Sequence, residues 1–152
     1  MTISLDLQIE SGTDGVPHES EFVIWIKASL QREFERLEQT IRIVQEAESL
    51  ALNSKFRGID RPTNVLAFPG DNDHLDYDFL GDLVICAPVV LSEARQQQKS
   101  WSAHWAHMVV HGMLHLQGYD HDKESAALQM EALEIRILNT LGYTNPYNEM
   151  PN

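Results

Sequence analysis

The stretch His111-Gly-Met-Leu-His115-Leu-Gln-Gly118-Tyr-Asp-His121 closes a helix-forming segment that begins near Trp101. His111 and His115 are four residues apart. On an α-helix they therefore lie roughly 6 Å apart along the axis and about 40° apart around it, so both imidazoles can bind one metal ion. Gly118 can end the helix, because glycine readily adopts the left-handed conformation of a helix C-terminus. His121 can then return as a third nitrogen ligand. Three histidines leave a fourth coordination position open, which is typical of a catalytic site.

The spacing of this motif, H-x3-H-x2-G-x2-H, is also that of the metzincin zinc proteases. Those enzymes carry Glu directly after the first His as the general base for peptide hydrolysis, whereas this chain has Gly112. A metalloprotease is therefore an alternative that the spacing favours and Gly112 opposes. Glycine inside a helix costs about 1 kcal/mol relative to alanine. We therefore expect Gly112 to accommodate the close approach of a bulky substrate or of a neighbouring backbone.

The metal motif and two further segments resemble the YbeY family of bacterial metal-dependent endoribonucleases. The further segments are Phe56-Arg-Gly-Ile-Asp-Arg-Pro-Thr-Asn-Val-Leu-Ala-Phe-Pro69 and Leu80-Gly-Asp-Leu-Val-Ile85. The resemblance extends over essentially the whole chain. It implies an endoribonuclease specific for single-stranded RNA, acting in ribosomal RNA processing (3′-end maturation of small-subunit rRNA) and in ribosome quality control. It also implies the ribosome or a ribosomal protein as a partner, a cytoplasmic location, and no role on DNA.

The resemblance also assigns a role to Arg57, because family members carry a functionally important arginine in this segment. A guanidinium is planar and permanently charged, so Arg57 is suited to pair with the scissile phosphate. Lys55, Arg57 and Arg61 lie within seven residues of one another and could form a local basic patch. The alternative is that this cluster is a solvated loop. The predicted catalytic residues are Arg57, His111, His115 and His121.

The predicted metal ligands are His111, His115 and His121, and nitrogen ligation favours one Zn²⁺ per chain. Ni²⁺ is the next choice and Cu²⁺ or Fe²⁺ are possible, whereas Mg²⁺ and Ca²⁺ prefer oxygen. His107 with His111 is a rival pair at the same spacing, but a third ligand beyond Gly118 lies nearer to His115. We therefore expect His107 to lie near the site without binding the metal. The flanking residues Asp120 and Asp122 could accept the other N–H of a ligand histidine, or Asp122 could cap the last helix. His18 and His74 fall in predicted loops and receive no role.

Length and composition predict one metal-dependent hydrolase domain over residues 1–152. The single cysteine, Cys86, lies among apolar residues and is expected to be buried, in keeping with a reducing cytoplasm. No segment is long and apolar enough to span a membrane. The net charge of −12 opposes non-specific binding to nucleic acid. A second alternative is a ribosome-associated RNA-binding factor whose metal is structural, because docking on a ribosome or a partner would supply the encounter with RNA that an anionic protein makes difficult.

Hydrophobic periodicity predicts an α+β fold with a four-stranded mixed sheet, about five helices and the metal-binding helix at the centre. The predicted helices cover residues 19–38, 46–56, 88–99, 101–118 and 123–141, and the predicted strands cover residues 3–9, 40–45, 63–68 and 79–86. Helical crossovers early in the chain indicate parallel pairing of the first strands, whereas the last two could be antiparallel. Residues 71–78 form an acidic segment, which we expect to be a solvated loop rather than a calcium site.

Overall fold

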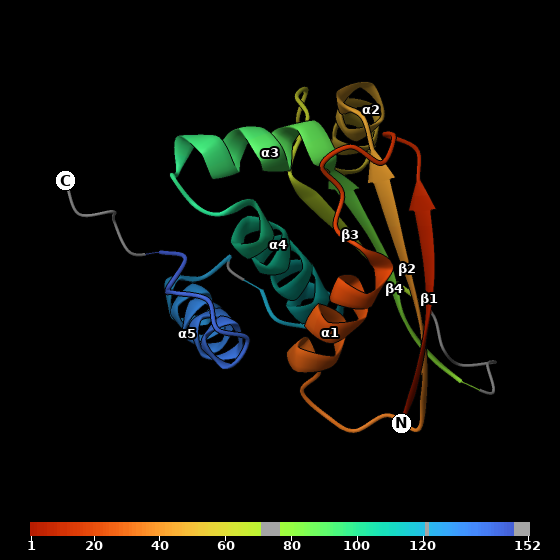
Figure 1. Ribbon diagram of the computed structural model, residues 1–152, viewed down its shortest axis with the longest axis vertical. Helices are drawn as coiled ribbons and strands as arrows, with labels where there is room; N and C mark the ends of the chain where they lie inside the picture. The colour runs from red at the N-terminus through yellow and green to blue at the C-terminus, as the bar shows by residue number, and fades with distance from the viewer. Residues whose placement is uncertain (71–76, 121, 148–152) are drawn as a thin grey trace.

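A computed structural model of the protein describes residues 1–70, 77–120 and 122–147. These residues form a four-stranded mixed sheet and five helices, which confirms the predicted α+β class (Figure 1). Most of the predicted acidic loop, with His74, lies outside the described residues. In chain order the elements are β1 (Thr2–Ile9), α1 (Glu19–Ser29), β2 (Arg36–Val44), α2 (Glu46–Arg57), β3 (Val65–Pro69), β4 (Asp78–Cys86), α3 (Ala87–Gln96), α4 (Trp101–Leu116) and α5 (Glu124–Thr140).

The strand order in the sheet is β1-β2-β4-β3. β1 pairs with β2 and β2 with β4 in parallel, whereas β3 and β4 are antiparallel. Parallel neighbours need a long crossover, which α1 supplies between β1 and β2. β3 and β4 follow each other directly in the chain, so they can pair antiparallel. The predicted pairing pattern is confirmed.

The two faces of the sheet are covered by different helices (Figure 1). Leu83 and Ile85 on β4 are fully buried on the face that packs against α1 and α4, and α5 packs on these two helices in turn. Val84 and Cys86 alternate with them along the strand and form a smaller apolar cluster with Leu52 of α2. α2 and α4 therefore lie on opposite faces of the sheet.

α4 is the central helix of the fold, as the sequence predicted. It packs against α1, α3, α5, β3 and β4. Ser100 caps its N-terminus by accepting a hydrogen bond from the backbone N–H of Ala103. Trp105 and Met113 are fully buried in the core, and burial of such side chains stabilises the fold by about 1.5–3 kcal/mol each. Gly118 follows the helix with φ +98°, the left-handed conformation predicted for this turn.

The first helix is shorter than the predicted range of residues 19–38. α1 ends at Ser29, and Leu30 already has an extended backbone. Phe34 and Leu37 are buried as predicted, but from the connection after α1 and from β2. Apolar residues at these two positions fit a helical stripe, yet Leu37 also begins the period-two alternation of β2. The prediction was wrong because it extended the helical period into the strand.

Two predictions from the composition are also tested by the structure. Cys86 is fully buried in the cluster beneath α2, and burial raises the pKa of its thiol. It therefore behaves as the small buried apolar residue that its neighbours predicted. Across the described parts of the chain, no helix combines the length and apolar character required to cross a bilayer.

Candidate metal centre

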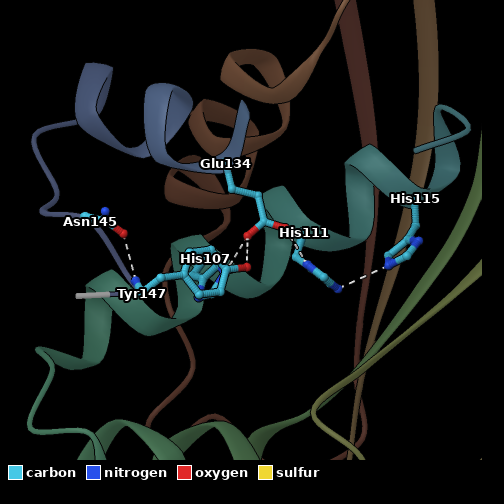
Figure 2. A network of polar contacts seen from close by, with 6 residues as sticks. All are labelled: His107, His111, His115, Glu134, Asn145 and Tyr147. Carbon is cyan, nitrogen blue, oxygen red and sulfur yellow. Dashed lines mark hydrogen bonds and ion pairs between the residues drawn. The ribbon is translucent and has the colours of Figure 1, made fainter. Parts of the chain in front are cut away.

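α4 carries a row of four histidines along one face. Neighbouring rings lie edge to face, with centroid distances of 6.0 Å from His104 to His107, 6.2 Å from His107 to His111 and 4.6 Å from His111 to His115. The spacings of three, four and four residues produce this row, because residues three and four apart share a face of a helix. Figure 2 shows three of these side chains, His107, His111 and His115, projecting from α4.

His111 and His115 have the geometry of two ligands of one ion. Their Nε2 atoms are 3.1 Å apart. Two nitrogens bound tetrahedrally to zinc, each at 2.0–2.1 Å, are about 3.3 Å apart. The His111 side chain is 20% exposed, so the pair lies at the edge of the hydrophobic core and solvent can reach it. The structure therefore brings together the pair that the sequence predicted, and the pair fits a metal ion.

A carboxylate from α5 orients His111. Oε1 of Glu134 lies 2.6 Å from Nδ1 of His111, and the Glu134 side chain is fully buried. An ionised carboxylate can only accept, so His111 donates its Nδ1–H. Nε2, the atom that faces His115, then keeps its lone pair for a metal ion. A hydrogen bond of this kind fixes the tautomer and the ring orientation of metal-binding histidines in general.

The second oxygen of Glu134 has its own donors (Figure 2). Oε2 lies 2.8 Å from Nε2 of His107 and accepts the hydroxyl of Tyr147. Burial alone would raise the pKa of Glu134, but the hydrogen bonds from His107 and His111 lower it to about 2. Burial lowers the pKa of His107, so this ring is neutral and donates Nε2–H to the carboxylate. Burial, with the hydrogen bond to Glu134, raises the pKa of Tyr147. The carboxylate is thus ionised and accepts from three donors.

A second combination of groups could also hold a metal ion. His107, His111 and Glu134 each offer one ligand atom, and these atoms lie within 4.8 Å of one another. In that arrangement a metal would replace the hydrogen bonds that now join Glu134 to both rings. At the pair His111 and His115, by contrast, the two Nε2 atoms face each other while the hydrogen bonds to Glu134 stay in place. His111 belongs to both combinations.

The remaining predicted residues are placed only in part. His121 lies outside the described residues, so its role as third ligand stays a prediction. The suggestion that Asp122 caps the last helix was wrong, because the N-cap of α5 is Lys123, whose own side chain makes no capping hydrogen bond. Asp122 instead donates its backbone N–H to Oδ1 of Asp120, at 2.7 Å.

Arg57 is the last residue of α2 and is exposed. α2 covers the face of the sheet opposite α4, so Arg57 and the histidine pair start from opposite sides of the sheet. Lys55 and Arg61, its partners in the predicted basic cluster, are also exposed. The assignment of Arg57 to a phosphate stays a prediction.

Gly112 has a different role from the one predicted. It is buried, and a Cβ atom at this position would lie 2.7 Å from Cδ2 of Leu83 and 3.2 Å from Cγ2 of Val65. Side chains of β4 and β3 therefore occupy the space beside Gly112, rather than a substrate or a neighbouring backbone. A larger residue here would point into the sheet, so this position cannot supply the catalytic base of a metzincin protease.

Two histidines outside the site have structural roles. Nε2 of His104 lies 3.0 Å from Oε1 of Glu93. Burial would raise the pKa of Glu93, but hydrogen bonds from His104 and Asn64 lower it. His18, for which the sequence suggested no role, is the N-cap of α1, and its Nδ1 accepts the backbone N–H of Ser20.

Glu134 and Tyr147 did not emerge from the sequence as site residues. Glu134 lies on the apolar stripe of α5, four residues after Met130 and three before Ile137, and all three side chains are buried. A carboxylate at a core position needs a hydrogen-bonding partner, because an isolated buried charge is strongly unfavourable. That mismatch was the available signal for Glu134. Tyr147 follows the last helix and carries no comparable pattern.

The structure defines an α+β protein with a mixed sheet against a central helix. Its candidate metal site is a histidine pair oriented by a buried carboxylate. A comparison with protein families is more specific. Residues 8–142 match the family described as Endoribonuclease YbeY. The chain belongs to this family, as the sequence motifs predicted. Membership makes it an endoribonuclease, a class of hydrolase, and implies a role in the maturation of ribosomal RNA.

A solved structure supports the fold. The protein TM1509 from Thermotoga maritima, whose structure was determined in solution, is 24% identical in sequence with a TM-score of 0.53. The match covers 99% of this chain and 98% of that chain. At this level of identity the similarity establishes the shared fold alone.

Proposed function

We propose that this protein is a metal-dependent endoribonuclease that cleaves single-stranded RNA during the 3′-end maturation of small-subunit rRNA and in ribosome quality control. The observation that carries the proposal is the pair of Nε2 atoms of His111 and His115, 3.1 Å apart on the central helix of a YbeY-family chain. His121 is the proposed third ligand, and Zn²⁺ is the proposed ion, with Ni²⁺ as the alternative. Nitrogen ligands of this kind suit both metals.

A divalent ion held by neutral ligands lowers the pKa of bound water and stabilises the anionic transition state of phosphodiester hydrolysis. The residues of the chain contribute orientation. His111 presents Nε2 because Glu134 accepts its Nδ1–H. His115 presents Nε2 from the next turn of the same helix. The neutral rings leave the full charge of the ion available to a phosphate.

The surface beside the C-terminal end of α4 offers space for an unstacked nucleotide. A hollow of about 550 Å³ is lined by residues that include Gln31, Arg32 and Tyr119. The guanidinium of Arg32 lies 3.8 Å from the centre of the Phe34 ring and is largely exposed. Aromatic rings and arginine are the groups on which the bases of single-stranded RNA stack. Arg57 is the proposed contact to the scissile phosphate.

The net charge of −12 affects how the enzyme meets its substrate. An acidic protein repels the RNA backbone at long range, so free encounter is slow. We therefore propose that the protein docks on the ribosome or on a ribosomal protein in the cytoplasm, and that this docking supplies the encounter. The same charge gives some support to the alternative, an RNA-binding factor with a structural metal.

Cleavage assays separate these functions. Purified protein, freed of contaminating nucleases, is incubated with single-stranded RNA, with the matching duplex and with casein, each with and without a chelator. We expect cleavage of the single strand alone, abolished by the chelator and restored by Zn²⁺. His111→Ala, prepared in parallel, controls for residual nuclease. RNA binding without cleavage would support the binding factor, and hydrolysis of casein would support the protease.

A further inference from the structure

The segment after α5 returns to the histidine row of α4. Tyr147 places its ring against His107, with the centroids 5.3 Å apart and the planes at 85°, and donates its hydroxyl hydrogen bond to Glu134 (Figure 2). The backbone N–H of Tyr147 donates to Oδ1 of Asn145 at 2.8 Å, which holds the turn that leads into this contact. Three separate parts of the chain thus meet at the Glu134 carboxylate: α4, α5 and the segment that follows α5.

We infer that Glu134 and Tyr147 are positioning residues for the metal ligand His111. The inference rests on the metal site proposed above. Glu134 holds His111 in the tautomer whose Nε2 is free of hydrogen, and Tyr147 holds Glu134 in place. Neither residue binds the ion.

The geometry separates orienting from binding. Oε1 of Glu134 contacts Nδ1 of His111, whereas Nε2 of the same ring faces His115. Because the two nitrogens lie on different sides of the imidazole, an ion bound at Nε2 is remote from the carboxylate. The other oxygen is also in use, since it accepts from His107 and Tyr147. Both oxygens of Glu134 are therefore hydrogen-bonded without an ion.

Tyr147 matters because a glutamate side chain is flexible. Holding Glu134 in one rotamer costs side-chain entropy, and the ionised carboxylate is fully buried. Hydrogen bonds to a charged group are stronger than those between neutral groups, so they offset this cost. The phenol donates one of them from outside the helix pair. Tyr147→Phe therefore removes this donor and keeps the ring that packs against His107.

The test measures metal affinity, not RNA cleavage. The variants are Glu134→Gln, which removes the charge and keeps the size, and Tyr147→Phe, which removes only the hydroxyl. The matched controls are Glu124→Gln, an exposed glutamate in the first turn of α5, and Tyr143→Phe, another tyrosine after that helix. The Kd for Zn²⁺ is measured on folded protein by competition with a chromophoric chelator. The absorption spectrum of the Co²⁺ form is recorded to compare ligand sets.

We expect Glu134→Gln to weaken Zn²⁺ binding about 10- to 100-fold, the range found when groups that orient metal ligands are changed. Tyr147→Phe should weaken it several-fold, and the two controls should match the wild type. The Co²⁺ spectrum should keep its shape once each variant is saturated, because the ligands are unchanged. A purely structural role would lower the unfolding free energy of the metal-free protein and leave the Kd of the folded form unaltered.

Three results would overturn the inference. The first is an unchanged Kd for Zn²⁺ in Glu134→Gln. If that variant does not fold, an unchanged Kd for Zn²⁺ in Tyr147→Phe would overturn the inference instead. The second is a changed Co²⁺ spectrum at saturation, because it would make Glu134 a ligand, as in the combination with His107 and His111. The third is a wild-type protein that binds no metal, which would also remove the metal from the proposed function. A wild type that binds metal and does not cleave RNA would refute the proposed function, while the expected change in Kd would still support the roles of Glu134 and Tyr147.

Discussion

Enlarging Gly112 tests how closely α4 packs against the sheet. A Cβ atom at this position would lie 2.7 Å from Cδ2 of Leu83, about 1 Å closer than an optimal carbon–carbon contact. Overpacking of a core costs about 1–3 kcal/mol, whereas alanine improves on glycine in a helix by about 1 kcal/mol. For Gly112→Ala we therefore expect a net loss of about 0–2 kcal/mol in the free energy of unfolding.

Gly112→Glu should be far more damaging, although it would complete the metzincin motif. The carboxylate would enter the apolar contact between α4 and the sheet without a partner, and an unpaired buried charge costs several kcal/mol. Total stabilities of domains are about 5–15 kcal/mol. We expect this variant to be largely unfolded and to have no protease activity.

Urea denaturation of the metal-free proteins measures both effects. Leu83→Val, combined with Gly112→Ala, serves as the matched test, because a smaller residue at position 83 makes room for the new methyl group. Leu83→Val lowers the free energy of unfolding by leaving a small cavity. This decrease should be at least about 0.5 kcal/mol smaller in the Gly112→Ala background than in the wild type. If Gly112→Glu folds with wild-type stability, position 112 does not face Leu83 and the reasoning fails.

Three further predictions concern the site. His111→Ala, His115→Ala and His121→Ala should each lose most of the bound metal and activity, with double variants little worse; full metal occupancy in any single variant, measured by elemental analysis, would remove that residue from the ligand set. Arg57→Ala should abolish or greatly reduce RNA cleavage at unchanged metal content, and Arg57→Lys should restore it only in part; wild-type turnover of the alanine variant would exclude the arginine from the mechanism. The metal-free protein should lose stability in acid, because Glu134 has a folded pKa of about 2 against an ordinary value of 4.5, and its contribution is fully present above pH 4.5 and lost as the pH falls toward 2. His107 acts in the same direction below pH 6.5, because burial lowers its pKa and it takes up a proton on unfolding. Unfolding free energies between pH 7 and pH 2 should therefore fall less steeply for Glu134→Gln than for the wild type, and equal slopes would contradict the assignment.

The sequence predicted the sheet and the central helix well because their signals are local. The alternation in β1, the turn at Gly118 and the crossover through α1 each depend on residues close together in the chain. The end of α1 was missed because the apolar residues of β2 extend the same helical stripe. The histidine pair could be predicted from a spacing of four residues.

The surroundings of the pair could not be predicted in the same way. Glu134 is 23 residues from His111, and Tyr147 is 40 residues from His107. Such contacts depend on how α5 packs on α4, which periodicity does not specify. Gly112 was misjudged for a similar reason, since only the packing of α4 shows that position 112 faces Leu83. The sequence motifs therefore identified the histidine pair, whereas the residues that surround it were found only from contacts between segments far apart in the chain.

The central place of α4 also affects the order in which the nascent chain can fold. All four strands precede Trp101, yet the apolar face of the sheet is buried against α4, which ends at Leu116. During synthesis from the N-terminus, α1 can cover only part of that face, and the rest stays exposed until α4 has left the ribosomal exit tunnel. We therefore expect nascent chains arrested before residue 101 to be degraded rapidly by added protease. Chains arrested with α5 fully emerged should resist it.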